Sequence, residues 1–369
     1  MKYFLHALAG MTLAAGAASA GGIDRSGQSI GALFEKGTYA ELSFGYVSPS
    51  VTGNDLVGYG GAATGNVADP YAAFGLAYKQ DLNDRLSLAF ILDRPFGADV
   101  LYDPTSVMLG NTKAYAATTS ATILGRYKMD RFSVHGGVRL QQARAFVHLE
   151  GAAYGGLSGY SVALDRNMAL GYVIGAAYEI PDIALRVALT YNSAIEHDFD
   201  TVETLGAAVI GVTPTTVKTP QSVNLDFQTG VAADTLVFGQ IRWVKWSEFR
   251  LDPATFIQSV PDGLINLHDT VTYTLGVGRK FNDTWSGAAS ITYEPATGDD
   301  LVSPLAPTNG KTGITLAAIY TKDNMKITTG INYTLLGDAF AETGTPDTAR
   351  ADFSGNSAVG IGVKIGFTF

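Results

Sequence analysis

Four arginines in this sequence, Arg126, Arg139, Arg186 and Arg242, have the chemistry to bind a carboxylate. A guanidinium presents two parallel N–H donors, which match the two oxygens of a carboxylate better than a lysine ammonium does. Each arginine lies in a segment where apolar and polar residues alternate, at a position of the polar set. Arg139 and Arg186 are the best candidates, because each segment leads to one of the two most apolar connections.

A second interpretation of these arginines is structural. The polar set also holds three lysines, Lys280, Lys326 and Lys364, and four acidic residues, Glu41, Asp93, Asp226 and Glu294. Cations and carboxylates that share an enclosed space tend to pair with one another. The sequence therefore leaves two possibilities for each arginine, a ligand contact or an internal ion pair.

Two long connections are unusually apolar. The connection at 150–167 contains Tyr154, Leu157 and Tyr160, and the one at 195–220 contains Leu205, Val209 and Ile210. An exposed apolar patch would capture a hydrophobic molecule through burial of area, at roughly 25 cal/mol per Å². The alternative is that these side chains pack the two connections against each other as a lid.

Enzyme chemistry is not indicated. The stretches "GGLSG" and "FSGNSAVG" do not fit a Gly-x-Ser-x-Gly nucleophile elbow, and "GYGGAATG" does not fit the dinucleotide-binding pattern,. The chain has no Cys, and no His/Asp spacing suggests a metal site,. A net charge of −9 argues against nucleic acid as a partner,. We expect no catalytic residue, no metal and no cofactor.

The elements that must position these residues are β-strands. The clearest case is the C-terminal stretch "VGIGVKIGFTF", residues 359–369, whose alternate residues are all apolar or aromatic, while the others are Gly, Lys and Thr. A period of two places the two sets on opposite faces of a strand. An apolar outer face and a small or charged inner face are typical of a wall with lipid outside and a crowded lumen.

About fourteen such segments follow one another, starting near 40, 70, 85, 117, 131, 168, 183, 221, 235, 270, 284, 312, 324 and 357,. Short polar turns such as "KMDR" alternate with long connections at 53–69, 97–116, 150–167, 195–220, 247–269, 295–311 and 337–356. This layout predicts an all-β fold, a single 14-stranded antiparallel transmembrane β-barrel. Near Gln141–Arg144 the alternation changes phase, which indicates a bulge or, as we prefer, the exit from the membrane,.

The two ends of the chain indicate its compartment. Residues 1–20 have a positive start, an apolar stretch and a small-x-small ending at Ala18–Ala20, and we interpret them as a removed signal peptide,. The terminal Phe369 is the ending seen in chains handed to the outer-membrane assembly machinery. We expect the outer membrane of a Gram-negative bacterium, with outer-membrane lipids around a monomer.

Several segments together resemble the FadL/TodX family of outer-membrane transporters for long-chain fatty acids and other hydrophobic compounds. They are "RLSLAFILDRPFGADVLYD", "RYKMDRFSVHGGVRLQ", "GYVIGAAYEIPDIALRVALTYNSAIEHDFDT" and "TPQSVNLDFQTGVAADTLVFGQIRWVKWSEF", in that order. The resemblance covers essentially all of 21–369. It implies a barrel plugged by an N-terminal hatch, passive uptake with capture between the third and fourth long loops, and lateral release through the wall.

The resemblance assigns residues 21–38 to the hatch and 39–369 to the barrel. It implies ligand contacts in the hatch from Ile23, Gln28, Ser29, Ile30 and Phe34. This hatch lacks the Asn-Pro-Ala segment of the family and is about half as long. The lumen is therefore expected to be partly open, or filled by a loop such as 97–116.

The resemblance also implies a lateral gap at a kinked third strand. Here "LDRPFG" places a proline at a strand end, where it removes a donor from the ladder,. Asp93, Arg94, Pro95, Phe96 and Gly97 are therefore the gate candidates. The expected function is uptake of hydrophobic molecules, with long-chain fatty acids favoured. The alternative is a diffusion porin for small polar solutes with a partly open lumen.

Overall fold

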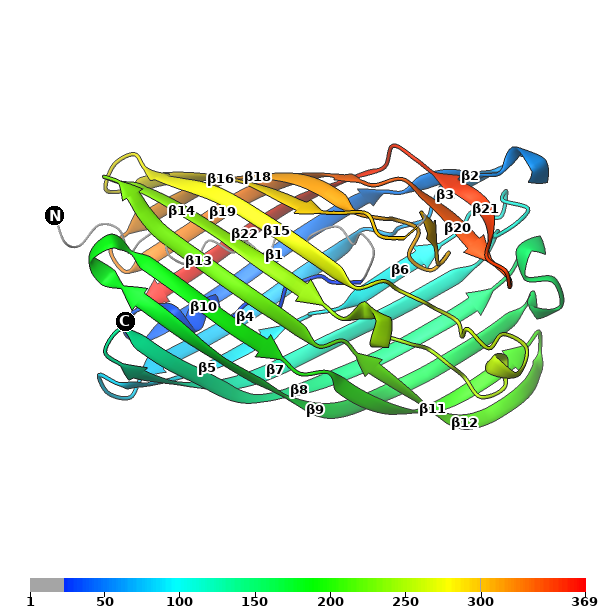
Figure 1. The fold of residues 1–369 in the computed structure, drawn as a ribbon, viewed down its shortest axis with the longest axis horizontal. Helices are drawn as coiled ribbons and strands as arrows, with labels where there is room; N and C mark the ends of the chain where they lie inside the picture. Colours follow the sequence, from blue (N-terminus) through cyan, green and yellow to red (C-terminus); the bar gives the residue numbers. More distant parts are fainter. Residues whose placement is uncertain (1–22, 299) are drawn as a thin grey trace.

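The computed structural model describes residues 23–298 and 300–369. The predicted signal peptide at 1–20 and the first two residues of the predicted hatch lie outside the described residues. The described chain forms a closed β-barrel with the hatch inside it (Figure 1). None of the helices in the described part is long and apolar enough to cross a membrane.

Fourteen strands make the wall, and each is antiparallel to its neighbours. They are β1 (Tyr39–Ser50), β4 (Tyr71–Asp81), β5 (Leu86–Asp93), β7 (Lys113–Met129), β8 (Phe132–Leu149), β9 (Tyr160–Ile180), β10 (Leu185–Asn192), β13 (Ser222–Ala232), β14 (Thr235–Val244), β15 (Thr270–Lys280), β16 (Trp285–Glu294), β18 (Lys311–Lys322), β19 (Met325–Leu336) and β22 (Ser357–Thr368). The ring closes where β1 pairs with β22, from Tyr39↔Thr368 to Ser50↔Ser357. The predicted fold class and strand number are confirmed.

Two predicted loops are largely strand. β9 begins at Tyr160, and the connection 195–220 is a hairpin of β11 (Ile195–Leu205) and β12 (Ala208–Thr219). β11 pairs with both β12 and the upper part of β9. Valine and threonine are frequent in this hairpin, and buried and exposed residues alternate along β11. This pattern favours a strand. The predicted long connections at 150–167 and 195–220 thus contain strand, at 160–167 and along most of 195–220.

The phase change in β8 is a bulge. The register between β8 and β9 shifts at Ala143/Ala145, and both strands continue to the pair Leu149↔Tyr160. The bulge, one of the two interpretations of Gln141–Arg144, is therefore present, and the exit from the membrane stays a prediction. A bulge moves the side chains of the following residues to the other face and lets one strand change face without ending.

The end opposite the C-terminus is closed by folded connections (Figure 1). A second sheet contains β2 (Thr52–Asp55), β3 (Ala63–Asn66), β17 (Leu301–Val302), β20 (Ala339–Thr343) and β21 (Thr348–Phe353). Short 3-10 helices complete the connections: η3 (Val57–Tyr59), η4 (Ala152–Leu157), η6 (Trp246–Glu248) and η7 (Phe256–Gln258). At the other end, η5 (Pro181–Ile183) forms a turn, and η2 (Gly31–Phe34) lies in the hatch.

The two faces of the wall follow the predicted alternation. In β22, Val359, Ile361 and Phe367 are exposed on the outside, whereas Lys364 is buried in the lumen. Elsewhere the exterior is equally apolar, and Leu170 for example is 71% exposed. An outer surface of this kind is stable in the hydrocarbon layer of a membrane and not in water.

Candidate functional site

The hatch is attached to the wall by its backbone. Asp24 forms an isolated antiparallel bridge with Phe96. The N–H of Gly97 donates to the carbonyl of Ile23 at 2.9 Å, and the N–H of Arg25 donates to the carbonyl of Pro95 at 2.8 Å. The hatch thus adds a short strand where the wall strand is interrupted between β5 and β6 (Gly97–Leu101).

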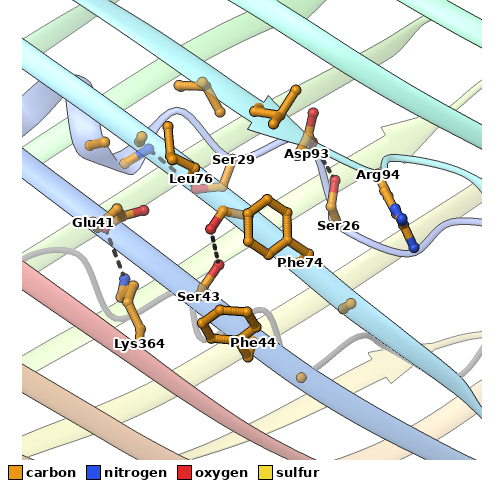
Figure 2. Close-up of a pocket in the computed structure, with 18 of the residues that line it drawn as sticks. Ser26, Ser29, Glu41, Ser43, Phe44, Phe74, Leu76, Asp93, Arg94 and Lys364 are labelled. Atoms are coloured by element: carbon orange, nitrogen blue, oxygen red, sulfur yellow. Dashed lines mark hydrogen bonds and ion pairs between the residues drawn. The ribbon is translucent and has the colours of Figure 1, made fainter.

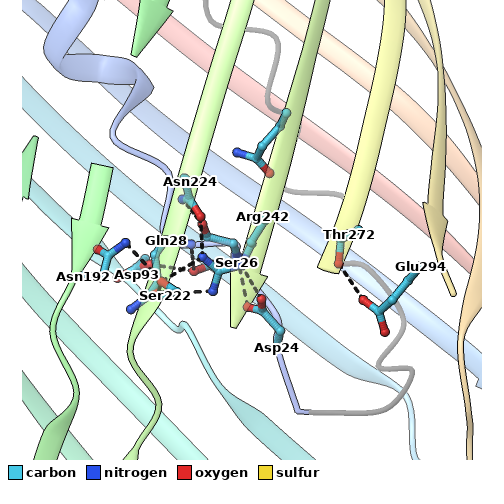
Figure 3. Close-up of polar contacts among 12 residues, drawn as sticks. Asp24, Ser26, Gln28, Asp93, Asn192, Ser222, Asn224, Arg242, Thr272 and Glu294 are labelled. Atoms are coloured by element: carbon cyan, nitrogen blue, oxygen red, sulfur yellow. Dashed lines mark hydrogen bonds and ion pairs between the residues drawn. The ribbon is translucent and has the colours of Figure 1, made fainter. Parts of the chain in front are cut away.

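Polar side chains fasten the next part of the hatch to the opposite wall (Figure 3). Arg242 donates from Nε to Asp24 at 2.6 Å and from Nη2 to Gln28 at 3.1 Å. The Ser222 hydroxyl donates to Gln28 Oε1 at 2.8 Å, and the Asn224 amide donates to the carbonyl of Gly27. Gln28 is fully buried, and the partners of its side-chain oxygen are the wall residues Ser222 and Arg242.

The apolar hatch residues lie in different surroundings. Ile23 packs with Phe96 in the large apolar cluster that the connections at the closed end of the barrel form. Ile30 packs with Leu124 and Val173 in a second, separate cluster. Ser29 lies between these two residues in sequence and lines the cavities on both sides of the hatch.

Phe34 lies between two cations. The guanidinium carbons of Arg126 and Arg186 are each 4.6 Å from the centre of its ring, and His135 meets the ring edge-on. Phe34 and both arginines line a cavity of about 1060 Å³ at the end of the barrel that holds the C-terminus. Phe34 also packs against the apolar cluster that contains Ile30. Cation–π attraction holds its ring against the two arginines.

The four predicted arginines all point inward but do not form one site. Arg126 pairs with Glu179 and Arg242 with Asp24. Arg139 donates to Thr122 at 2.9 Å and to Asn192 at 3.0 Å. Arg186 donates to Gln228 at 3.0 Å. Within the described residues, neither Arg139 nor Arg186 has a carboxylate within 4.0 Å. The two arginines preferred on sequence grounds are thus the two that lack an ion pair.

The strand pairing of the wall is interrupted beside the predicted gate. β4 and β5 pair from Asp81↔Ser87 up to Leu76↔Leu92, and no β5 or β6 partner is recorded for residues 71–75 of β4. The two sides meet again where the N–H of Asp69 donates to the carbonyl of Asp99 at 3.1 Å. We call this unpaired stretch, between 71–75 and 93–98, the wall window.

The window is lined from both sides of the wall (Figure 2). A cavity of about 70 Å³ runs between hatch residues such as Ser26, the inner face of β4 and the outward Phe44 and Phe74. Ser26 donates to Asp93 at 2.6 Å, and Arg94 is exposed. Pro95, Phe96 and Gly97 are buried, and both N–H and C=O of Phe96 are bound by Thr118 of β7. Of the five predicted gate residues, Arg94 is therefore exposed, and the other four are buried or half-buried.

One residue at this window was missed by the sequence interpretation. The Arg25 guanidinium lies 4.0 Å above the ring of Tyr71 on one side of the window. On the other side, a Cβ built on Gly97 would be only 2.7 Å from the Arg25 Cζ, so glycine is needed for this approach. Arg25 is the one arginine of the predicted hatch 21–38, and this was the available signal.

A second cavity next to the hatch is polar. Its volume is about 190 Å³, and it reaches from Asp24, Arg25 and Ser26 to the inner face of β14–β19. Hydroxyl groups dominate that wall: Thr272, Thr274, Ser290, Thr292, Thr315 and Thr334. The short hatch thus fills only part of the lumen.

The predicted capture residues fall into two groups. Tyr160 is fully buried, donates to Glu203 at 2.9 Å and stacks on Phe256 at 4.8 Å. Tyr154 and Leu157 pack against the same cluster, and burial raises the pKa of the Tyr154 phenol. In contrast, Leu205, Val209 and Ile210 are exposed at the tip of the β11–β12 hairpin. These six side chains therefore do not form a single exposed patch.

The lid above the lumen is a continuous apolar cluster. Loop 97–116 contributes Tyr102, Met108 and Leu109, and the same cluster includes Ile23 of the hatch and Phe96 at the window. At this end, loop 97–116 fills the space that the short hatch leaves, which is one of the two expectations. The polar cavities show that the lumen beside and below the hatch is partly open.

Comparisons with known proteins give the family. A family model described as outer membrane protein transport protein (OMPP1/FadL/TodX) matches residues 7–369. Among solved structures, a Pseudomonas aeruginosa FadL homologue is similar at 16% identity and a TM-score of 0.69, over 97% of this chain and 98% of that one. The Ralstonia pickettii toluene transporter TbuX is 14% identical with a TM-score of 0.65, over 99% of both chains.

The P. putida toluene transporter TodX is 15% identical with a TM-score of 0.64, over 90% of each chain. Similarity at these identities supports the fold, and the family model supports the membership. A search of curated proteins finds no significant match. The chain therefore belongs to the OMPP1/FadL/TodX family of outer-membrane transport proteins of Gram-negative bacteria.

Proposed function

We propose that this barrel takes up hydrophobic molecules passively, with long-chain fatty acids as the favoured ligands. The observation that carries this proposal is the apolar cluster that runs from the lid to Ile23 and Phe96, directly beside the unpaired wall window. A ligand that follows it would remain out of water until it reached the membrane. The names of similar structures, which include two toluene transporters, agree with a hydrophobic ligand.

Capture would begin at the β11–β12 hairpin. Leu205, Val209 and Ile210 offer exposed apolar area there, and Tyr154, Leu157 and Tyr160 line the lid beneath. A ligand that contacts the tip could enter only if the lid side chains move, because Tyr160 is fully buried.

The inner site would lie beside the hatch. Ile23 and Ile30 supply apolar contacts, while Gln28 and Ser29 supply polar ones. Arg139 and Arg186 carry charges without an ion-paired carboxylate among the described residues, and a fatty acid head group would provide one. Arg126 and Arg242 are engaged with Glu179 and Asp24, so they would keep the lumen in shape.

Release would pass through the wall window. Ala73 lies in the part of β4 that has no partner in β5 or β6, and it lines the cavity at the window. The substitution Ala73→Trp fills a cavity of about 70 Å³ and should abolish uptake of fatty acid and of toluene alike,. Ala72→Trp places the same side chain on the exposed outer face and should leave uptake intact. Normal uptake by Ala73→Trp would exclude lateral release at this position.

A diffusion porin for small polar solutes is the second candidate. The hydroxyl-lined cavity of about 190 Å³ and the large cavity below it favour this function. Planar bilayers distinguish the two, because a porin gives a large, stable, ion-selective conductance. The expected result is that the barrel gives no such conductance in the bilayer. Cells should take up radiolabelled oleate only when they contain the protein. Identification of the molecule that copurifies with the barrel would name the ligand class directly.

A further inference from the structure

Arg25 of the hatch stands at the point where three cavities meet. It lines the window cavity with Asp93, the hydroxyl-lined cavity with Thr272, and a third cavity of about 70 Å³ with Tyr71 and Gly97. No other described residue lines all three. Arg25 thus lies where the lumen and the window adjoin.

Arg25 forms no ion pair within the described residues. No carboxylate lies within 4.0 Å of its guanidinium, and the Nε atom is buried without a hydrogen-bond partner. Its neighbour Asp24 pairs with Arg242, and Asp93 accepts a hydrogen bond from Ser26. Its recorded side-chain contacts are the Tyr71 ring and the backbone of Gly97. A partly buried cation with an unbound donor is an incomplete site, because such charges are normally paired.

The geometry matches the head group of an amphipathic acid. The Arg25 Cζ lies 4.0 Å from the centre of the Tyr71 ring, and Nε makes no hydrogen bond within the described residues, which leaves a donor for an oxygen ligand,. The third cavity has an apolar part, lined by Ile23, Val51, Val100 and Leu305, and two carboxylates, Asp69 and Asp99, which do not pair with Arg25. A carboxylate on Arg25 would thus leave an alkyl chain in apolar contact.

We propose that Arg25 binds the carboxylate of an amphipathic ligand at the wall window and so makes transit selective for acids over neutral hydrocarbons. This inference rests on the proposed uptake of hydrophobic molecules. It assigns the head-group contact nearest the exit to the hatch, whereas the four arginines considered above all belong to the wall. The hatch would then be a recognition element as well as a plug.

The experiment compares two ligands of equal chain length, dodecanoate and 1-dodecanol, in equilibrium binding to the purified barrel. Arg25→Met keeps the bulk and removes the charge, and Arg25→Lys keeps the charge without the planar fork. Arg279→Met is the matched control, because Arg279 is exposed near a short turn and, within the part of the chain that the structure describes, its side chain bonds Ala233 and Thr235 alone. Correct folding is checked for each variant by the shift of unheated barrel on denaturing gels.

We expect Arg25→Met to weaken dodecanoate binding by about tenfold to a hundredfold, as for loss of a charge-assisted hydrogen bond. Binding of 1-dodecanol should change less than about twofold, Arg25→Lys should be intermediate, and Arg279→Met should match the native chain. Equal effects on both ligands, or none on either, would overturn the role of Arg25 and leave the proposed uptake standing. Failure of the native barrel to bind either ligand would overturn the uptake proposal as well.

Discussion

Replacing Arg242 by Met removes the side chain that holds the hatch to the far wall. Its guanidinium makes four hydrogen bonds, two to the wall residues Ser222 and Asn224 and two to the hatch residues Asp24 and Gln28. Ser222 still binds Gln28 in the variant, and the backbone bridge of Asp24 to Phe96 also remains. The hatch should therefore loosen without leaving the lumen.

The size of the effect follows from the two lost hatch bonds. A hydrogen bond to a charged group contributes roughly 1.5–3 kcal/mol when it is buried. The Asp24 side chain is 20% exposed, and both it and Arg242 line the hydroxyl-lined cavity, so we take about 1 kcal/mol for each bond,. The sum of about 2 kcal/mol corresponds to an increase of about 30-fold in the open population of the hatch.

Amide hydrogen exchange measures that population. The N–H groups of Arg25 and Gly97 are bonded between hatch and wall, so peptides that contain them should exchange about 30-fold faster in Arg242→Met,. Peptides from β18 and β19 serve as an internal reference and should not change. The Arg279→Met variant removes an arginine from β15 that does not contact the hatch. Unchanged exchange of the hatch peptides in Arg242→Met, or equal acceleration in Arg279→Met, would refute this account of the fastening.

Two further predictions concern the lid and the window. The Glu203 carboxylate accepts hydrogen bonds from the Tyr160 hydroxyl and the N–H groups of Thr255 and Phe256, each at 2.9 Å. Glu203→Ala leaves three donors unpaired at about 1–3 kcal/mol each, so loop 247–269 should detach and trypsin should cleave after Arg250. Glu196→Ala, at an exposed site on the same strand, should stay resistant, and a protected Arg250 in Glu203→Ala would contradict the lid contact. Gly97→Ala places a Cβ against the Arg25 guanidinium, which must move off Tyr71. Dodecanoate binding should fall about tenfold while 1-dodecanol binding is retained, and unchanged dodecanoate binding would show that this position of Arg25 is not required.

Much of the fold could be predicted because a barrel wall repeats one local rule. Outward residues must be apolar and inward residues small or polar, so each strand carries its own signal. The strand starts at 40, 221, 235 and 357 were predicted within one residue of those observed. The signal failed at 150–167 and 195–220, where strands leave the membrane. There both faces of the sheet meet protein or water, and the lipid-facing signal no longer applies.

The candidate site was less predictable, because its properties depend on which strands become neighbours. The sequence by itself determined the barrel, the inward direction of Arg126, Arg139, Arg186 and Arg242, and the interruption at Pro95, since each follows from local alternation or from proline chemistry. Only the tertiary structure decided which arginines are paired, that Phe34 lies between two cations, and that Arg25 meets Tyr71 and Gly97 at the window. These contacts join residues from distant parts of the chain, and the closure of the barrel, which no local pattern encodes, brings them together.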